Sequence, residues 1–585
     1  MRARRSKNEN FQWRFVILKI FFLCVGAAII GRLFSLQILD HQKYAAAADR
    51  QQGVSLTLTA KRGMMYFQDK DGNRKIAALN KEWPAVAVIP KSVKEPETVS
   101  LELSSALNIS KESIDALLAK TTDPFEIVAR KIDPQKAEAI DSKKLSGVQV
   151  FSEFRRFYPG GSLASQALGF INFEKDIETG QYGLERFYNA ELSGEAGILS
   201  STKDAKGTLL YLGRKILKPQ ENGAGVILTI DPNIQKKSEE EIKKLVKKWD
   251  AESASFLVMD PLTGKILALG GYPDFDPNYY SKERDISVFN NPIISSQYEL
   301  GSIMKPVTMA AGINEGLVNP DTTYTDTGEA IIGAFHIKNY DLQAHGIQTM
   351  TQVLEKSLNT GAMYVETLLG KETFLSYMES FGFGEKTGIQ FPNEAKGNIS
   401  NLSYNRDSDY ATASFGQGIS ITPLQIAVAI SAIANGGTLV QPYLVDSIED
   451  DSGNRTIIEH PSKGQVISKE TSEMVTKMLV SVVENGFDNH AGIQGYFVAG
   501  KTGTAQVPYK DKRGYDPNRA IHSFVGYAPA FHPKFLMFIQ LNEPRGVKFA
   551  SSSITPTFHE IAKYMLSYLQ IPQDIQAAPK KSTLR

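Results

Sequence analysis

The sequence predicts an α+β protein in which a membrane helix and a β-rich middle module precede a larger C-terminal domain. Three observations predict this arrangement. One apolar run lies near the N-terminus, strand-like alternation recurs through the middle of the chain, and strands and helices are mixed after residue 225. With 585 residues, the chain is also too long for one ordinary hydrophobic core, so two or more folded domains are expected.

The composition excludes several classes of function. There are 65 basic and 64 acidic residues and no basic block outside the N-terminus, which argues against nucleic acid as a partner. Cys24 is the only cysteine, which excludes an internal disulfide and a cysteine-based zinc site. The histidines form no His-x-x-x-His pair. We therefore expect no metal and no cofactor, and structural roles for His336, His345 and His522.

The apolar run from Phe15 to Ile30 predicts one membrane helix whose N-terminus lies in the cytoplasm, because basic residues precede it. Lys19 and Arg32 can extend toward opposite interfaces. Everything after residue 40 then lies outside the cytoplasmic membrane. A cleaved signal peptide is the alternative, with an Ala-x-Ala match at residues 45–48. That match lies well past the apolar run, which favours an uncleaved anchor.

Residues from about 51 to 213 predict a module without its own chemistry. Val54–Leu58 alternates like a strand, Lys111–Lys120 is helical in pattern, and Asp69–Asn73 indicates a turn. No nucleophile stands at a usable spacing from a base. The Arg- and Gly-containing segments there predict tight turns and buried ion pairs; they are Arg62-Gly63, Arg156 to Gly161 and Gly183 to Arg186.

A connector at residues 215–225 predicts the start of a second domain. A strand at 226–230 leads to a helix for which Asp231 is the N-cap and Pro232 the first residue. Two strand-like segments then flank Asp260–Gly264 and predict a hairpin. From Ser302 to about residue 434 helical periodicity dominates, and strands return near 495–507 and 523–541.

Ser302 and Lys305 provide the first candidate chemistry. A helix that begins at or just after Ser302 places residues i and i+3 on one face, so the Lys305 amine can reach the Ser302 hydroxyl. Pro306 then lies in the first turn, where a missing N–H costs least. A second Ser-x-x-Lys match at 200–203 is predicted to be a loop. On its own, Ser302 could equally be a helix cap beside a solvated lysine.

Two later stretches complete the candidate site. Ser357 and Asn359 fall in a turn between apolar helices, so a hydroxyl and an amide can point into one cavity. Residues 501–504, Lys-Thr-Gly-Thr, follow the strand-like residues 496–500, and a strand with Gly500 and Gly503 would leave room for an extended peptide alongside. A second Lys-Thr-Gly at 386–388 has no strand before it and is predicted to be a loop.

The order Ser302-x-x-Lys305, Ser357-x-Asn359, Lys501-Thr502-Gly503 is typical of serine β-lactamases and penicillin-binding proteins. Over nearly its whole length the chain resembles a class B penicillin-binding protein, a peptidoglycan D,D-transpeptidase. Other segments that look like landmarks of that family are the membrane anchor, Arg62-Gly63, Arg156-x-Tyr158-Pro159, Gly183-Leu184-Glu185, Leu228 to Asp231, Ser414 to Gly418 and Phe524 to Pro529.

Some positions refine this resemblance. The Lys-Thr-Gly-Thr-Ala form and the Gly-Phe-Ile-Asn segment at Gly169 are more similar to the division or sporulation branch than to the elongation branch. Leu300 stands where the family usually has proline, and Leu358 where many members have serine. Neither position reacts, so these departures bear on efficiency or antibiotic affinity rather than on the chemistry. The stretch after Gln570 is too short for another domain.

The resemblance implies the penicillin-binding transpeptidase fold, an antiparallel sheet flanked by helices with a helical subdomain, preceded by a membrane helix and an elongated β-rich pedestal. It implies that Ser302 is the nucleophile, Lys305 its base and Ser357 the proton donor to the leaving group. The implied substrate-binding residues are Asn359, Lys501, Thr502, Gly503 and Thr504. The expected domains are a cytoplasmic tail (1–12), an anchor (13–36), a pedestal (37–220), a transpeptidase domain (221–572) and a polar tail (573–585).

The resemblance also implies partners: stem peptides that end in D-alanyl-D-alanine, β-lactams, the membrane, a membrane glycosyltransferase and other division proteins. Three alternatives stay open. A β-lactamase uses the same residues but needs a deacylating group, and no dedicated carboxylate is evident. A β-lactam sensor normally needs signalling architecture on the membrane side, whereas about a dozen residues precede the apolar run. A scaffold would recruit wall enzymes without using Ser302.

Overall fold

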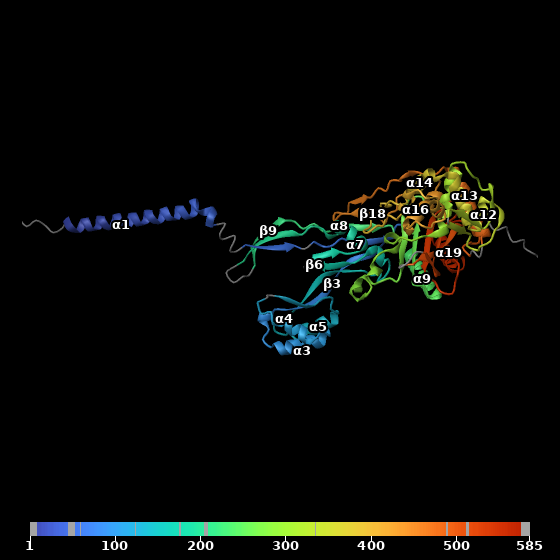
Figure 1. Cartoon of the computed structure of the whole chain (residues 1–585). Coiled ribbons are helices and arrows are strands. Elements are labelled where there is room, and N and C mark those ends of the chain that lie inside the picture. The colour runs from blue at the N-terminus through green and yellow to red at the C-terminus, as the bar shows by residue number, and fades with distance from the viewer. Residues whose placement is uncertain are drawn as a thin grey trace, which may run out of the picture. The chain divides into compact units, whose positions relative to one another are not determined.

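The computed structural model describes residues 9–44, 53–58, 60–122, 125–174, 177–203, 209–333, 335–486, 490–509 and 514–574. Figure 1 shows the chain coloured from the N-terminus to the C-terminus. The chain forms two compact units, which are described separately. The first comprises Met1–Lys61 and Gly194–Asn222, and the second comprises Arg62–Ser193 and Gly223–Arg585. The domain boundaries expected from the sequence stay predictions.

The first unit contains a long apolar helix and a small antiparallel sheet. The helix α1 (Glu9–Phe34) continues into a π-helical turn, and Trp13–Leu39 is long and apolar enough to cross a membrane. The predicted apolar helix is therefore confirmed, while its orientation across a membrane stays a prediction. The sheet has the order β1-β8-β9, and its strands are β1 (Gly53–Leu58), β8 (Gly197–Lys203) and β9 (Leu209–Lys218).

Two local predictions in this unit are wrong. The Ser-x-x-Lys copy at 200–203 lies in β8, the central strand of the sheet, and not in a loop. The predicted connector begins later than residue 215, because β9 extends to Lys218 and pairs there with Ile198. In both places strand pairing determined the structure, and the Gly, Lys and Pro content did not indicate this pairing.

The second unit begins with a seven-stranded sheet that joins the middle module to the C-terminal domain. Its path is β19-β18-β10-β2-β3-β4, and β5 also pairs with β3. The strand β10 pairs in parallel with β2, where Val226 lies opposite Met65. The two predicted modules therefore share one sheet. Its strands are β2 (Met65–Gln68), β3 (Arg74–Val88), β4 (Glu126–Ala129), β5 (Val148–Phe157), β10 (Gly225–Leu228), β18 (Val445–Glu449) and β19 (Arg455–Ile457).

The predicted buried ion pairs are confirmed around Glu185. Its two carboxylate oxygens meet Arg62 Nη2 at 2.7 Å and Arg156 Nε at 2.6 Å, and the Tyr158 hydroxyl donates to it at 3.2 Å. The Glu185 side chain is fully buried. Burial alone would raise the pKa of this carboxyl, but Arg156 and Arg62 lower it below its ordinary value. Glu185 therefore joins three distant segments of the unit.

The middle module also contains helices and short strands outside the seven-stranded sheet. Helices α3, α4 and α5 pack on β3, β4 and β5 around a core that includes Val86, Leu103 and Ile114. The bounds are α3 (Pro96–Leu107), α4 (Lys111–Leu118), α5 (Pro134–Ser142), α6 (Ser165–Leu168), α7 (Gly183–Phe187), α8 (Asn189–Ser193), β6 (Ile171–Glu174) and β7 (Ile177–Gly180).

A five-stranded antiparallel sheet organises the C-terminal domain, in the order β12-β11-β23-β22-β21. Alternate residues of its strands enter two different cores. Phe256 and Phe524 pack with α9 and α19, whereas Leu257 and Val525 pack with α16 and α17. In Figure 1, α9 and α19 accordingly lie together, apart from α16. The strands are β11 (Ser253–Met259), β12 (Ile266–Tyr272), β21 (Ala499–Pro508), β22 (Tyr515–Ala528) and β23 (Phe535–Asn542).

Several local predictions for this domain are confirmed. Asp231 caps α9 (Pro232–Trp249) by accepting hydrogen bonds from the N–H groups of Asn233 and Ile234, and Pro232 is its first residue. The strands β11 and β12 form the predicted hairpin. The other principal helices are α11 (Lys305–Asn314), α12 (Met350–Glu355), α13 (Asn359–Leu369), α14 (Lys371–Ser380), α15 (Asp407–Ala413), α16 (Pro423–Ala434), α17 (Lys469–Asn485) and α19 (Thr555–Tyr568).

Candidate active site

Ser302 lies in a turn that leads into a buried helix. A 3-10 helix, Gly301–Met304, carries Ser302, and α11 then starts at Lys305 with Pro306 in its first turn. The Lys305 Nζ atom lies 3.0 Å from Ser302 Oγ and donates a hydrogen bond to it. The predicted contact across one helical turn is therefore present, with a tighter first turn than an α-helix.

Ser357 lies between the amines of two lysines. It occupies the predicted turn between α12 and α13, with a φ of 55°, which is uncommon for a serine. Lys305 Nζ donates to the Ser357 carbonyl oxygen at 2.5 Å and lies 3.2 Å from its hydroxyl. Lys501 Nζ donates to the same hydroxyl at 3.0 Å. Ser302, Lys305, Ser357 and Lys501 thus form one connected network.

Burial shifts the protonation of both lysines. Lys305 is 1% exposed and Lys501 is 2% exposed. Burial lowers the pKa of Lys305 well below its ordinary value, and the nearby Lys501 charge lowers it further. Burial also lowers the pKa of Lys501, to about 7. Burial and the Lys501 charge both favour the uncharged amine of Lys305, which is the form that a proton acceptor needs.

Asn359 is oriented by a second, buried network. Its Nδ2 donates to the Lys338 carbonyl oxygen and its backbone N–H to Asn339 Oδ1, both at 2.9 Å. Asn339 in turn donates to the carboxylate of Asp326, as does the Thr360 hydroxyl. Asp326 and Asn339 are 1% exposed. No local motif indicates them, because the hydrogen bonds that link them to Asn359 and Thr360 span 20 to 34 residues.

The Lys501-Thr502-Gly503-Thr504 segment lies inside the edge strand β21, in agreement with the strand predicted near 495–507, although β21 begins only at Ala499. The described residues 496–498 precede that strand. A Cβ on Gly503 would lie 2.6 Å from the Leu300 carbonyl oxygen and 2.5 Å from Ser523 Oγ. Glycine is therefore needed for β21 to approach the turn before Ser302, and this contact does not provide the space for a peptide that we expected.

A cavity of about 440 Å³ brings most of the predicted residues together. Those that line it are Ser302, Ser357, Asn359, Lys501, Thr502 and Thr504. Lys305 and Gly503 lie behind this lining. Other lining residues were not predicted from the sequence. Gln417 belongs to the landmark segment Ser414 to Gly418, and the rings of Tyr340 and Phe549 lie 5.8 Å apart.

The competing motif copies lie elsewhere. Residues 386–388 form a loop, as predicted, in which Thr387 donates to Glu394. Other Ser-x-Asn matches occur at Ser6, Ser403 and Ser452, and Ser403 lies in a short 3-10 helix. Ser452 is in a turn. Ser6 lies outside the described residues. The predicted structural histidines have protein contacts: His336 with Glu329, His345 with Asp341 and His522 with Ser553.

Comparison with known proteins agrees with this geometry. Residues 254–563 match the family model of the penicillin-binding protein transpeptidase domain, and residues 57–228 match the penicillin-binding protein dimerisation domain. The chain belongs to the penicillin-binding protein transpeptidases. Its pedestal, sheet and helical subdomain are those that the family resemblance implied.

Relatives match this transpeptidase along nearly all of its length. Stage V sporulation protein D of Bacillus subtilis is 34% identical, with 97% of this chain and 87% of the relative covered. The peptidoglycan D,D-transpeptidase FtsI homolog of Mesostigma viride is 28% identical, with 96% and 97% covered. The structure of penicillin-binding protein 3 of Mycobacterium tuberculosis, complexed with ampicillin, is 26% identical with a TM-score of 0.69, and 90% and 98% of the two chains are covered.

Proposed function

We propose that this transpeptidase crosslinks peptidoglycan stem peptides through an acyl-enzyme on Ser302. One observation carries the assignment: Ser302 lines the cavity, and the buried amine of Lys305 lies behind it, 3.0 Å from its hydroxyl oxygen. Reaction class and substrate are those in the printed name of the Mesostigma viride relative. The residue roles follow from the contacts described above.

Lys305 acts as the base in the acylation step. A lysine with its ordinary pKa of about 10.4 is charged at neutral pH, and lowering that value by about three units takes roughly 4 kcal/mol of bias against the charged form. Burial and the Lys501 charge both act in this direction. Uncharged Lys305 then takes the proton as Ser302 Oγ attacks the penultimate D-alanine carbonyl carbon.

The backbone N–H groups of Ser302 and Thr504 stabilise the negative charge that develops on the carbonyl oxygen. The C–N bond to the terminal D-alanine breaks, and the proton held by Lys305 reaches the leaving amine through the Ser357 hydroxyl, which lies 3.2 Å from Lys305 Nζ. Lys501, Thr502 and Asn359 hold the substrate backbone and its terminal carboxylate. An acceptor amine then attacks the ester, forms the crosslink and returns a proton to Ser302.

The finer cellular role is proposed as septal or sporulation wall synthesis. The name of the Bacillus subtilis relative, stage V sporulation protein D, supports the sporulation role. The Lys-Thr-Gly-Thr-Ala form and the segment at Gly169, which are similar to the division or sporulation branch, support both roles. The helix α1 serves as a single-pass anchor with the N-terminus in the cytoplasm, so that the catalytic domain lies outside the membrane. The module at 37–220 serves as the pedestal that contacts a membrane glycosyltransferase or other division proteins.

Mass spectrometry of the enzyme labelled with penicillin tests this function. We expect the penicilloyl group on the peptide that carries Ser302, since this hydroxyl has a buried base beside it. We also expect slow release of the label over time, because a transpeptidase does not hydrolyse this ester efficiently.

Each alternative predicts another outcome of this labelling experiment, combined for the sensor with an assay of crosslinking. Rapid turnover with release of penicilloic acid would support a β-lactamase. Among the described lining residues of the cavity, Glu355 is the one carboxylate, and the Ser481 hydroxyl already donates to it. A stably labelled enzyme that forms no crosslinks with stem peptides would support a sensor. An unlabelled Ser302 would exclude the catalytic proposal and leave a scaffold.

The pH profile of acylation is expected to be bell-shaped. The acid limb reports Lys305, which must lose its proton to act as base. The alkaline limb reports Lys501, whose pKa of about 7 means that its charge, needed for the substrate carboxylate, is lost as the pH rises. The second-order rate constant for penicillin should fall about tenfold between about pH 7 and pH 8.5. Stopped-flow measurement of protein fluorescence or label incorporation checks this expectation.

The Lys501→Arg variant separates the two limbs. Because a guanidinium group stays charged throughout this range, the alkaline limb should disappear and the acid limb should remain. An alkaline limb that persists unchanged in Lys501→Arg would mean that another group titrates there.

A further inference from the structure

The hairpin of β21 and β22 has an outer half that the sheet does not support. In the inner half of the hairpin β22 is paired on both sides, because its residues 521–528 also pair with β23. The β21–β22 register shifts after Gln506, and beyond that shift Pro508 lies opposite Tyr515. No described strand flanks this outer part except its own partner. A two-stranded ribbon is only marginally stable alone, so other contacts must fix it.

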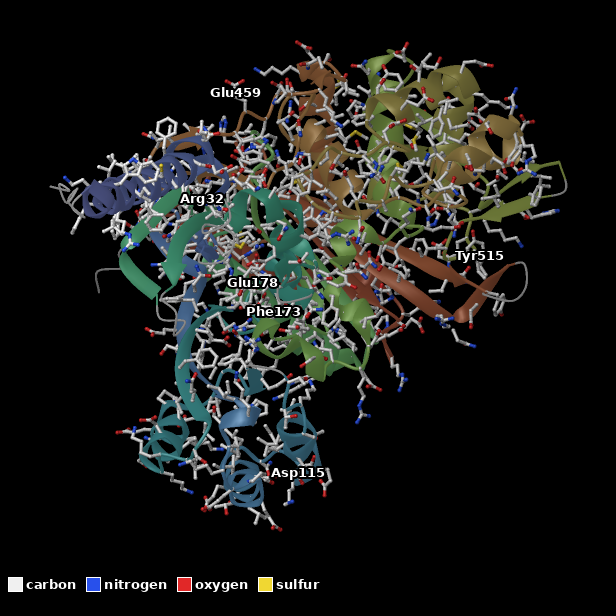
Figure 2. The ribbon with its side chains drawn as sticks, turned by 90° about the vertical axis from the view of Figure 1, so that its left-hand side faces the viewer. Arg32, Asp115, Phe173, Glu178, Glu459 and Tyr515 are labelled. Atoms are coloured by element: carbon white, nitrogen blue, oxygen red, sulfur yellow. The ribbon has the colours of Figure 1, made fainter. Side chains whose placement is uncertain are left out.

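Glu299 provides such a contact. The Tyr515 hydroxyl donates to Glu299 Oε2 at 2.9 Å, across 216 residues of sequence. The backbone N–H of Gly418 also donates to this carboxylate. Tyr515 lies on the outer part of the hairpin in Figure 2. Both side chains are half-buried, so this hydrogen bond is partly shielded from water and is stronger than one on the surface.

The segment that carries Glu299 is itself fixed, and it leads directly to the nucleophile. Tyr298 exchanges two backbone hydrogen bonds with Ile421, at 2.9 and 3.0 Å. The Gly301 N–H donates to the Gly416 carbonyl oxygen at 3.1 Å. Ser302 follows Glu299 by three residues. Glu299 is therefore a rigid anchor, and the hydrogen bond from Tyr515 fastens the hairpin to it.

The same contact joins two walls of the active-site cavity. The lining of the cavity includes Thr504, Gln506 and Arg519 from the hairpin, and Gln417, the neighbour of Gly418, from a separate segment. We propose that Glu299 and Tyr515 are positioning residues that set the spacing between these walls, and so determine how the enzyme accepts the acylamide part of its donor. This inference rests on the proposed function.

The chemistry of the donor explains why the spacing matters. A stem peptide or a penicillin with an acylamide side chain can pair with the free edge of β21 as an added strand, which requires that edge to be held in place. A β-lactam without that side chain uses Ser302 and the Lys501 region alone. The outer hairpin should therefore affect the two kinds of β-lactam differently.

The test compares benzylpenicillin with 6-aminopenicillanic acid, which lacks the side chain, on the full-length enzyme. For Tyr515→Phe we expect the second-order acylation rate constant of benzylpenicillin to fall about tenfold, the usual effect of losing a hydrogen bond to a charged group. For 6-aminopenicillanic acid it should change less than about twofold. Glu299→Gln should show the same preference, and the double variant should be no worse than the poorer single variant, since both remove one contact.

Tyr279→Phe is the matched control, because Tyr279 is 57% exposed and its variant should match wild type with both compounds. Equal losses with both β-lactams, or no loss with either, would overturn the inference; the first result would assign the pair to folding alone. Labelling of Ser302 in wild type is recorded in the same assay. Its absence would instead contradict the proposed function.

Discussion

Replacement of Ser302 by alanine is expected to abolish covalent labelling by penicillin, with the acylation rate falling at least about 10⁴-fold, the scale seen when a catalytic nucleophile is removed. The reason is structural as well as chemical. Among the described hydroxyls that line the cavity, those of Ser302 and Ser357 are the two that accept a hydrogen bond from the deeply buried Lys305. The Ser357 hydroxyl also accepts one from Lys501. The measurement is the incorporation of labelled penicillin into intact protein.

The second Ser-x-x-Lys copy supplies a matched control. Ser200 lies in β8, in the other compact unit. Penicillin should therefore label the Ser200→Ala variant at the wild-type rate. The fold should survive Ser302→Ala, since Lys305 keeps its hydrogen bond to the Ser357 carbonyl oxygen. The unfolding midpoint of both variants should therefore stay close to wild type. A Ser302→Ala protein that still forms the adduct would contradict the assignment.

The sequence predicted those parts of the site that depend on local chemistry. A serine and a lysine three residues apart at the start of a helix must lie on one face, and the structure places their side-chain atoms 3.0 Å apart. The N-cap of α9 at Asp231 and the hairpin β11–β12 followed from equally local signals. In each case a few consecutive residues carried all the information required.

Contacts between distant segments were beyond this kind of reasoning. The shared sheet depends on Val226 lying opposite Met65, although each strand alone suits many partners. The Lys501 segment lies in a strand, as predicted, but its own residues do not show that this strand pairs with β22. Local patterns report which residues suit a strand, whereas the choice of neighbours depends on the assembled fold.

The supporting residues of the site were missed for the same reason. Asp326 and Tyr515 have no motif around them, and their roles arise from hydrogen bonds to residues far along the chain. Buried polar groups must be satisfied, so each motif residue in the site requires partners of this kind. The sequence therefore predicts the reacting groups, and the structure shows the contacts that hold these residues in place.

Lys305→Met is expected to reduce acylation by about 10³-fold, within the range attributed to general base catalysis. Methionine keeps the length and the apolar stem of lysine at a position that is 1% exposed, but it has no proton-accepting nitrogen. The acid limb of the pH profile should disappear, because its titrating group is gone. Label incorporation over a range of pH, with Lys477→Met on the exposed face of α17 as control, checks both expectations.

Lys305→Arg distinguishes a base from a fixed positive charge. Arginine keeps the charge and can donate to the Ser357 carbonyl oxygen, but it does not give up its proton near neutral pH. If Lys305 acts by accepting the Ser302 proton, this variant should be as slow as Lys305→Met. If Lys305 acts only through its charge, Lys305→Arg should retain most of the acylation rate. Burial and the nearby Lys501 charge both lower the pKa of Lys305, which favours the uncharged amine that the first outcome requires.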